Sequence, residues 1–403
     1  MAPAPPVEPG FFPLDEELGL LPGSLSPQSQ AHLSRLAVWM PFERAAQMLA
    51  ALCGVQVSEA TTRRQTYAAG AAYEAVQAAQ ALRAEEPGDG PPADQLVLSA
   101  DGAMVPLIHG QWAEVKTLVI GEVAAAGPDA GEAQCTRLSY FSRMSEASVF
   151  AEQASVETAR RGVTEARQVC AVMDGAEWID GLVDLHRPDA LRILDFPHAA
   201  QAVSTIGQEA GVEELTSWLT TQLHELKHHG PAAVLAELSR LCVTLPLNES
   251  MRQQYGYLLK RQERMQYPQY QQDGWPIGSG IVESGNKVVM QARLKGAGMH
   301  WAPAHVNPML ALRTAECNDR WQEATQHLRA ARHAHHQMRR EQQARQRLRQ
   351  QICRTLLQRV AQREQDSPPP SPLPATSPSP PTKLGSKYSW RQPFLRRPVC
   401  AKT

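Results

Sequence analysis

Two short apolar runs, each leading into an Asp-Gly pair, are the feature that most constrains the fold of this chain. Val169–Met173 is continuously apolar and is followed directly by Asp174. Leu96–Ser99 is a similar run that leads into Asp101. Continuous apolar strands are typical of sheets that helices cover on both faces. We therefore expect an α/β fold in which both aspartates lie at strand ends.

The order of the neighbouring elements predicts a mixed sheet. Residues 115–123 and 137–141 indicate two further strands, which would form an antiparallel meander with the first. Helices are expected at 145–161 and 176–185, and a last buried strand at 191–194. This βββαβαβ order predicts a mixed sheet that is flanked by helices.

Beyond this sheet, the pattern becomes helical. Strand signals largely stop after Asp195, and residues 199–275 are expected to form helices only. A Gly-Ser-Gly turn at 278–280 then places Glu283 at the start of a further helix. The separation between Asp174 and Glu283 is too long for one helical connection, so we interpret 199–275 as an all-α insertion.

The N-terminal part differs from this core. Residues 1–27 are Pro-rich and are expected to be irregular, whereas residues 28–86 are expected to be helical. Ser58 is a suitable cap for a helix that carries Arg63 and Arg64 early in its course. This is the layout of a helix-turn-helix that reads DNA. An ordinary helical hairpin fits the same spacing equally well.

Positive charge gathers toward the other end of the chain. The whole chain of 403 residues has a formal net charge of −1, so any basic surface must be local. Residues 317–365 are expected to form a basic helix with many arginines and few acids, which favours DNA binding over a merely solvated face. Residues 366–403 are Pro/Ser-rich and are expected to be disordered.

Cysteines and hydropathy bear on the compartment. The seven cysteines are scattered without a Cys-x-x-Cys pair, which argues against a disulfide framework or a zinc ribbon. The N-terminus does not have the pattern of a signal peptide, and no apolar run approaches the roughly 18 residues of a membrane span. We therefore expect a cytoplasmic protein without a membrane partner.

Asp101, Asp174 and Glu283 are candidates for a metal site. Cleavage of a phosphodiester needs an activated oxygen nucleophile and a neutralised leaving oxygen, and two Mg²⁺ ions about 3.5–4 Å apart supply both. Mg²⁺ prefers a few carboxylates together with waters and phosphates. Three carboxylates from different elements fit this demand. Because Asp-Gly after a strand is also common turn chemistry, ordinary turn residues are the alternative.

Other side chains are candidates for accessory roles. Asp195 and His198, three residues apart at a strand end, could orient a metal ligand or contact DNA, and a histidine that merely caps the next helix is the alternative. Trp301 could stack on unpaired bases, or anchor the fold as a buried residue. Basic residues after Glu283 fit contact with the DNA backbone: Lys287, Arg293 and Lys295.

Taken together, these motifs resemble those of insertion-sequence transposases of the DDE class, in the Mutator-like superfamily. The resemblance covers roughly residues 28–325, with the motifs in the family's order. It implies an RNase H-like catalytic core formed by residues 94–198 and 276–316. The matching motifs are Ser99–Gly102, Trp112–Lys116, Met173–Gly175, Leu194–His198, Gly278–Glu283 and Arg293–Trp301.

The resemblance also implies roles for the candidate residues. Asp101, Asp174 and Glu283 would be the catalytic triad and would hold two Mg²⁺ ions, for which Mn²⁺ can substitute. Asp195 and His198 would match the superfamily's signature of Cys or Asp, two further residues, and His.

The implied reaction is cleavage at the ends of a mobile element, followed by attack of the freed 3′-hydroxyl on target DNA. The expected partners are the terminal repeats, the target DNA and further copies of the chain, at the nucleoid of a bacterial cytoplasm. Two alternatives stay open: a remnant that binds DNA without transposing, and an RNase H-like nuclease without strand transfer.

Overall fold

The computed structural model describes residues 25–82, 92–124, 133–244 and 248–366. Contacts divide the chain into two compact units, Met1–Met338 (unit 1) and Arg339–Thr403 (unit 2). Unit 1 contains the sheet and the helices around it, whereas the described part of unit 2 is helix alone. The predicted irregular N-terminus and disordered tail lie almost entirely outside the described residues.

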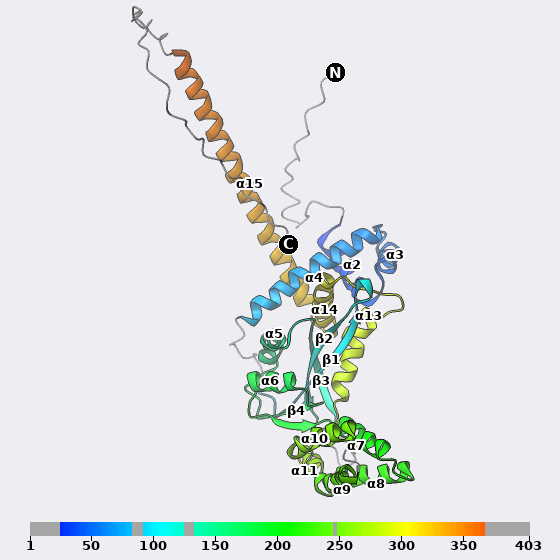
Figure 1. Cartoon of the computed structure of the whole chain (residues 1–403). Coiled ribbons are helices and arrows are strands. Elements are labelled where there is room, and N and C mark those ends of the chain that lie inside the picture. Colours follow the sequence, from blue (N-terminus) through cyan, green and yellow to red (C-terminus); the bar gives the residue numbers. More distant parts are fainter. Residues whose placement is uncertain (1–24, 83–91, 125–132, 245–247, 367–403) are drawn as a thin grey trace, which may run out of the picture. The chain divides into compact units, whose positions relative to one another are not determined.

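Five strands form one mixed sheet in the order β3-β2-β1-β4-β5 (Figure 1). The first three form the predicted antiparallel meander, and β4 and β5 continue the sheet in parallel with β1. The predicted mixed sheet is therefore confirmed. The strands are β1 (Gln95–Pro106), β2 (Trp112–Val123), β3 (Cys135–Arg143), β4 (Gln168–Met173) and β5 (Leu191–Leu194).

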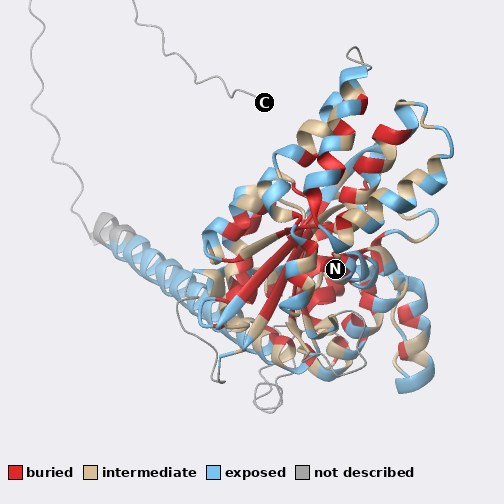
Figure 2. Cartoon of the chain, turned by 90° about the horizontal axis from the view of Figure 1, so that it is seen from below, coloured by how far each residue is buried: buried red, intermediate tan, exposed pale blue. Residues whose placement is uncertain are grey.

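Helices cover both faces of the sheet, as its continuously apolar strands require. On one face, α5 (Ala147–Arg160) and α6 (Glu177–His186) share a core with Leu98 of β1 and Leu118 of β2. On the other face, α7 (Phe196–Glu209) packs against the apolar side chains of β4 and β5. Figure 2 shows buried strands surrounded by helices whose outer faces are exposed.

The predicted insertion is helical throughout its described residues, 199–244 and 248–275, apart from the turns that join its helices. Its core is continuous with the α7 face of the sheet, because Leu238 and Tyr267 belong to the same buried cluster as Cys170 of β4. After α7, its α-helices are α8 (Leu215–His228), α9 (Pro231–Thr244), α10 (Glu249–Leu259) and α11 (Tyr267–Gln272).

The N-terminal helices pack against the helices that follow the insertion. The Ser58 side chain accepts the Thr61 N–H at 3.1 Å and caps α4, as predicted. The helix-turn-helix assignment stays a prediction. The helices of this layer are α2 (Pro27–Trp39), α3 (Phe42–Cys53), α4 (Glu59–Ala81), α12 (Gly280–Gly285), the π-helical turn Asn286–Gln291, α13 (Ala292–Leu294) and α14 (Pro303–Cys317).

A single long helix, α15 (Trp321–Asp366), confirms the helical part of the prediction for residues 317–365. Its first turns belong to unit 1, where Trp321 and Leu328 are buried with α4 and α14. Its side chains described from residue 340 onward are all exposed. The part of α15 from residue 340 onward belongs to unit 2.

We expect Gly70→Ala to destabilise unit 1 by about 2–3 kcal/mol, because α4 and α14 meet closely at this glycine. A Cβ atom at Gly70 would lie 2.2 Å from the Pro308 carbonyl oxygen, which belongs to the backbone and cannot rotate away. Gly256→Ala in α10 is the matched control, because no atom lies within 4 Å of its added Cβ. The control should be more stable than wild type by roughly 0.5–1 kcal/mol, because alanine has a higher helix propensity than glycine. Urea unfolding measures the free energy of unfolding of both variants, and equal changes in the two would contradict the packing argument.

Candidate active site

Three aspartates lie side by side where the parallel strands end. β1 pairs with β4 so that Leu98 lies opposite Ala171. Asp101 and Asp174 each lie three residues further along, which places them at the same level of the sheet. Asp195 follows the last residue of β5 as Asp174 follows the last residue of β4, and these two strands are also paired in parallel. The sheet therefore gathers three carboxylates from three adjacent strands.

Asp101 lies within its strand, which corrects the prediction that it ends one. It pairs with Thr117 of β2, and the pairing of β1 with β2 continues as far as Pro106. β4, by contrast, ends at Met173, and Gly175 turns the chain with a φ of +86°. The long β1–β2 hairpin thus carries Asp101 past the last paired residues of β4.

Asp101 is held by two hydrogen bonds. Its Oδ1 accepts the Gly102 N–H at 2.7 Å, and its Oδ2 accepts from Nδ2 of Asn286 at 2.9 Å. Burial raises the pKa of Asp101, and the negative charge of Asp174 adds to this rise against the lowering effect of both hydrogen bonds. The Oδ1 atom of Asn286 is buried without a hydrogen-bond partner among the described residues. Sequence reasoning gave Asn286 no role, although it follows Glu283 by three residues.

Glu283 lies on the helix that crosses the meander. Asn286 and Glu283 are three residues apart, so they share one face of the helical stretch that contacts Asp101. This helix packs closely on the sheet, since a Cβ atom at Gly285 would lie 2.6 Å from a Val119 methyl group of β2. The Glu283 side chain itself is exposed. Within the described ranges, no three His, Cys, Asp or Glu side chains form a group that could hold a metal ion.

The insertion holds the end of β4 in place. The Tyr257 hydroxyl donates to the Asp174 carbonyl oxygen at 2.5 Å, and Arg261 donates to the Gly175 carbonyl oxygen at 2.5 Å. The Asp174 carboxylate accepts the Ala176 N–H at 2.8 Å. Sequence reasoning missed Tyr257 because no local pattern indicates a contact across more than eighty residues.

Asp195 connects β5 to the turn before α12. Its side chain is fully buried, accepts the Ser279 N–H at 2.6 Å, and caps α7 by accepting the His198 N–H at 3.2 Å. It also contacts Nδ1 of His198. Burial alone would raise the pKa of Asp195, but the hydrogen bonds from His198 and Ser279 outweigh burial and lower it. Asp195, and not the histidine as in the alternative, therefore caps α7, and the tie to Ser279 was not predicted.

We expect the stability that His198 gains from Asp195 to disappear at high pH. The hydrogen bond to Asp195 raises the pKa of His198, so this stabilisation is complete below about pH 6.5 and is lost as the pH rises through the folded-state value. The lowered pKa of Asp195 sets the other limit, because its contribution is lost as the pH falls below about 3.9.

The measurement compares the melting temperatures of wild type and His198→Gln. The difference should be largest near pH ~5.5 and should shrink toward pH ~9. Because the His198 side chain is 43% exposed, the substitution should lower the free energy of unfolding by about 1 kcal/mol or less. A difference that stays constant across this range would assign another role to the histidine.

Two of the predicted DNA contacts are wrong, because the residues are buried. Arg293 is 3% exposed and donates from Nε to the Ala37 carbonyl oxygen at 2.8 Å. Trp301 is 4% exposed and donates from Nε1 to the Leu294 carbonyl oxygen at 3.1 Å. The Arg293 guanidinium lies 5.1 Å from the Trp301 ring, so the pair forms a cation–π contact inside the protein. Both residues anchor α13 and the chain that follows it.

The other predicted DNA contacts are exposed. Lys287 lies in the π-helical turn and Lys295 directly follows α13, and both residues are exposed. Arg63 and Arg64 are exposed on α4, with Arg63 at 4.0 Å from Glu59. Their exposure leaves them accessible to a phosphate backbone.

The architecture defines an α/β protein with a five-stranded mixed sheet that is flanked by helices and carries three aspartates at one level of adjacent strands. Comparison of the chain with models of known protein families finds no match, and a search of curated proteins finds no matching relative. Among the described helices, none has the length and apolar character needed to cross a membrane.

Proposed function

We propose that this protein is a DDE-class transposase with an RNase H-like core, which cuts DNA at the ends of an element and joins the 3′-hydroxyl to target DNA. The observation that carries the proposal is the placement of Asp101 and Asp174 at one level of adjacent parallel strands, with the Glu283 helix crossing beside them. The strand order 3-2-1-4-5, antiparallel then parallel, supports the RNase H-like assignment. The sequence motifs around the three acids support the activity.

The acids suit divalent metal ions. Asp101 is partly buried beside the like charge of Asp174, and a bound cation would offset this repulsion. The unpartnered amide oxygen of Asn286 adds a further oxygen donor beside them. Asp101, Asp174 and Glu283 would hold Mg²⁺, or Mn²⁺, which prefers such oxygen ligands. When bound, two such ions activate the attacking oxygen and neutralise the leaving oxygen.

Residues around the acids would keep them in place. The hydrogen bonds from Gly102 and Asn286 orient the Asp101 carboxylate. Tyr257 restrains the backbone at Asp174 from the insertion. Asp195 ties the end of β5 to the turn that precedes the Glu283 helix. Such restraint favours catalysis because reacting groups that are already positioned need no reorganisation.

DNA would be bound through exposed cations on both units. Lys287 and Lys295 follow Glu283 closely, so they would contact phosphates near the cleaved bond. In unit 2, α15 carries exposed arginines that form no ion pair among the described residues. These are Arg345, Arg347, Arg349, Arg354 and Arg359. Phosphate contacts of this kind give affinity without reading sequence.

Replacing the five arginines of unit 2 by glutamine should weaken DNA binding and its salt dependence. Removing one phosphate-binding cation lowers the slope of log K against log salt by about 0.9 for duplex DNA, so a fall of about 3–4 is expected if most of them touch phosphate. Fluorescence anisotropy over a salt series measures it. The matched control replaces five exposed glutamines of α15 by alanine, which keeps the helix: Gln342, Gln343, Gln346, Gln350 and Gln351. Equal slopes in the two variants would contradict a role for this helix.

The deciding experiment uses supercoiled plasmid that carries the element's ends, identified as inverted repeats in the DNA that flanks the reading frame. With Mg²⁺ or Mn²⁺ we expect 3′-hydroxyl ends at the repeats and joined products in target DNA. Cleavage without joined products would instead indicate a nuclease. Binding of the ends without any cleavage would indicate a remnant that no longer transposes. Because transposition pairs two ends, we expect the active assembly to contain more than one copy of the chain.

A further inference from the structure

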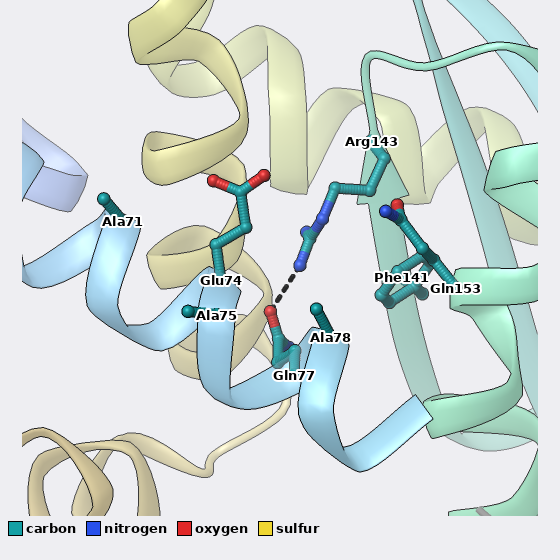
Figure 3. Close-up of a pocket in the computed structure, with 8 residues that line it drawn as sticks. All are labelled: Ala71, Glu74, Ala75, Gln77, Ala78, Phe141, Arg143 and Gln153. Atoms are coloured by element: carbon teal, nitrogen blue, oxygen red, sulfur yellow. Dashed lines mark hydrogen bonds between the residues drawn. The ribbon is translucent and has the colours of Figure 1, made fainter. Parts of the chain in front are cut away.

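A cavity lies apart from the aspartate row, between α4, β3 and α5. Its volume is about 270 Å³, and none of its lining residues takes part in the candidate active site. The α4 side is hollow because it presents Ala71, Ala75 and Ala78, whose small side chains leave the space open (Figure 3). The Phe141 ring and four charged or polar side chains line the rest, and the arrangement of these four indicates what the cavity can bind.

Arg143, at the end of β3, is a buried cation without a carboxylate partner. Its residue is 2% exposed, and no described acid lies within ion-pair distance. Nη1 donates to the Ser142 carbonyl oxygen at 2.8 Å, and Nη2 donates to Oε1 of Gln77 at 2.5 Å. A guanidinium has five N–H groups, so these bonds leave donors for a ligand. Burial lowers the pKa of Arg143 to about 10, which keeps it charged at neutral pH.

Acceptors without partners line the same cavity. Oε1 of Gln153 is buried and has no hydrogen-bond partner among the described residues. Glu74 also lines the cavity and forms no ion pair with any described residue, although its negative charge acts on Arg143. In the view of Figure 3, the Arg143 guanidinium lies between Glu74 and Gln153. Buried polar groups without partners are uncommon, and a bound ligand is one way to satisfy them.

We propose that this cavity binds a small zwitterion of the α-amino acid class, whose carboxylate pairs with Arg143 and whose ammonium group donates to Glu74 and Gln153. A simple anion would be repelled by Glu74 and would leave the Gln153 oxygen unsatisfied. A simple cation would be repelled by Arg143. The volume lies just below the roughly 300–1,000 Å³ of pockets for drug-sized ligands, which suits a molecule of amino acid size.

Titration calorimetry on the full chain tests the proposal with L-alanine, L-serine and L-leucine, and with acetate and methylammonium as the two halves of the zwitterion. At least one amino acid should bind about tenfold more tightly than either half. Glu74→Gln and Gln153→Leu should each weaken that binding by about tenfold or more. Gln80→Leu is the matched control, because its side-chain oxygen is also buried without a partner but does not line the cavity. The control should bind as wild type does.

A cavity-filling variant provides an independent test that leaves Arg143 intact. Ala75 is exposed on α4, so Ala75→Leu should keep the fold while its side chain enters the cavity and abolishes binding. The proposal is overturned if no probe binds to wild type at concentrations of about 10 mM. It is also overturned if acetate binds as tightly as the amino acids and Glu74→Gln does not weaken it, since the cavity would then be an anion site.

Discussion

Asp101→Asn is expected to slow metal-dependent strand cleavage by about 1,000-fold or more, which is roughly 4 kcal/mol of transition-state stabilisation. The substitution removes a negative charge from the acid that would hold the metal ions together with Asp174. The fold should survive it, because an amide has the shape of the carboxylate. The Asn286 side chain can turn so that its unpartnered oxygen accepts from the new amide. DNA binding should stay within about twofold of wild type, because the exposed cations are unchanged.

The other two acids provide the internal comparison. Asp174→Asn and Glu283→Gln should act in the same direction as Asp101→Asn. Asp273→Asn is the matched control, since Asp273 is exposed and accepts hydrogen bonds from Gln269 alone among the described side chains. A plasmid-cleavage assay measures the rate, and anisotropy measures binding. If all three acid variants cut as fast as the control, the aspartates are turn residues and the proposed site is wrong.

Arg313→Met is expected to destabilise unit 1 by about 3–5 kcal/mol, the largest stability effect that we predict for a single substitution. Arg313 is fully buried in α14 and donates to the carbonyl oxygens of Val289 at 3.0 Å and Val38 at 2.9 Å, and also to that of Val288. Val288 and Val289 lie in the π-helical turn, which departs from the regular hydrogen bonds of an α-helix, and Val38 lies in the last turn of α2, where carbonyls lack a donor within the helix. Methionine fills the space but donates no hydrogen bond, so the buried carbonyls of Val38 and Val289 lose this donor.

Arg35→Met is the control for this effect. Arg35 pairs with Glu316 at 3.0 Å but is 55% exposed, so its loss should cost less than about 1 kcal/mol. Urea unfolding followed by tryptophan fluorescence compares the two variants. Because the turn that Arg313 holds also carries Asn286, the remaining folded Arg313→Met protein should cleave more slowly than wild type. Equal stability losses in the two variants would show that the buried hydrogen bonds are not decisive.

Much of the fold is predictable from local sequence patterns. Val169–Met173 indicates a strand buried on both faces, and the structure contains it as the β4 strand between β1 and β5. Ser58 indicates a helix start, and it caps α4. The Gly-rich turn before Glu283 indicates another start, and α12 begins at Gly280. These predictions depend on spacing and capping within a few residues, which is why the sequence carries them.

The candidate site is predictable only in part. Asp101 and Asp174 follow apolar runs, and the parallel register brings them to one level. The strand that carries Asp101 is longer than its apolar run, because pairing with β2 and not hydrophobicity extends it. The roles of Asn286 and Tyr257 depend on partners that are far away in the chain, so no local pattern indicates them.

The sequence by itself determined which segments are strands and helices, their order, and that Asp174 follows a strand and Glu283 begins a helix. Those properties depend on side-chain periodicity and backbone capping, which act over one or two turns. Only the tertiary structure decided which charged side chains meet solvent. Lys287 is exposed whereas Arg293, six residues later, is buried against α2. Burial depends on which elements pack against each residue and not on its neighbours in sequence.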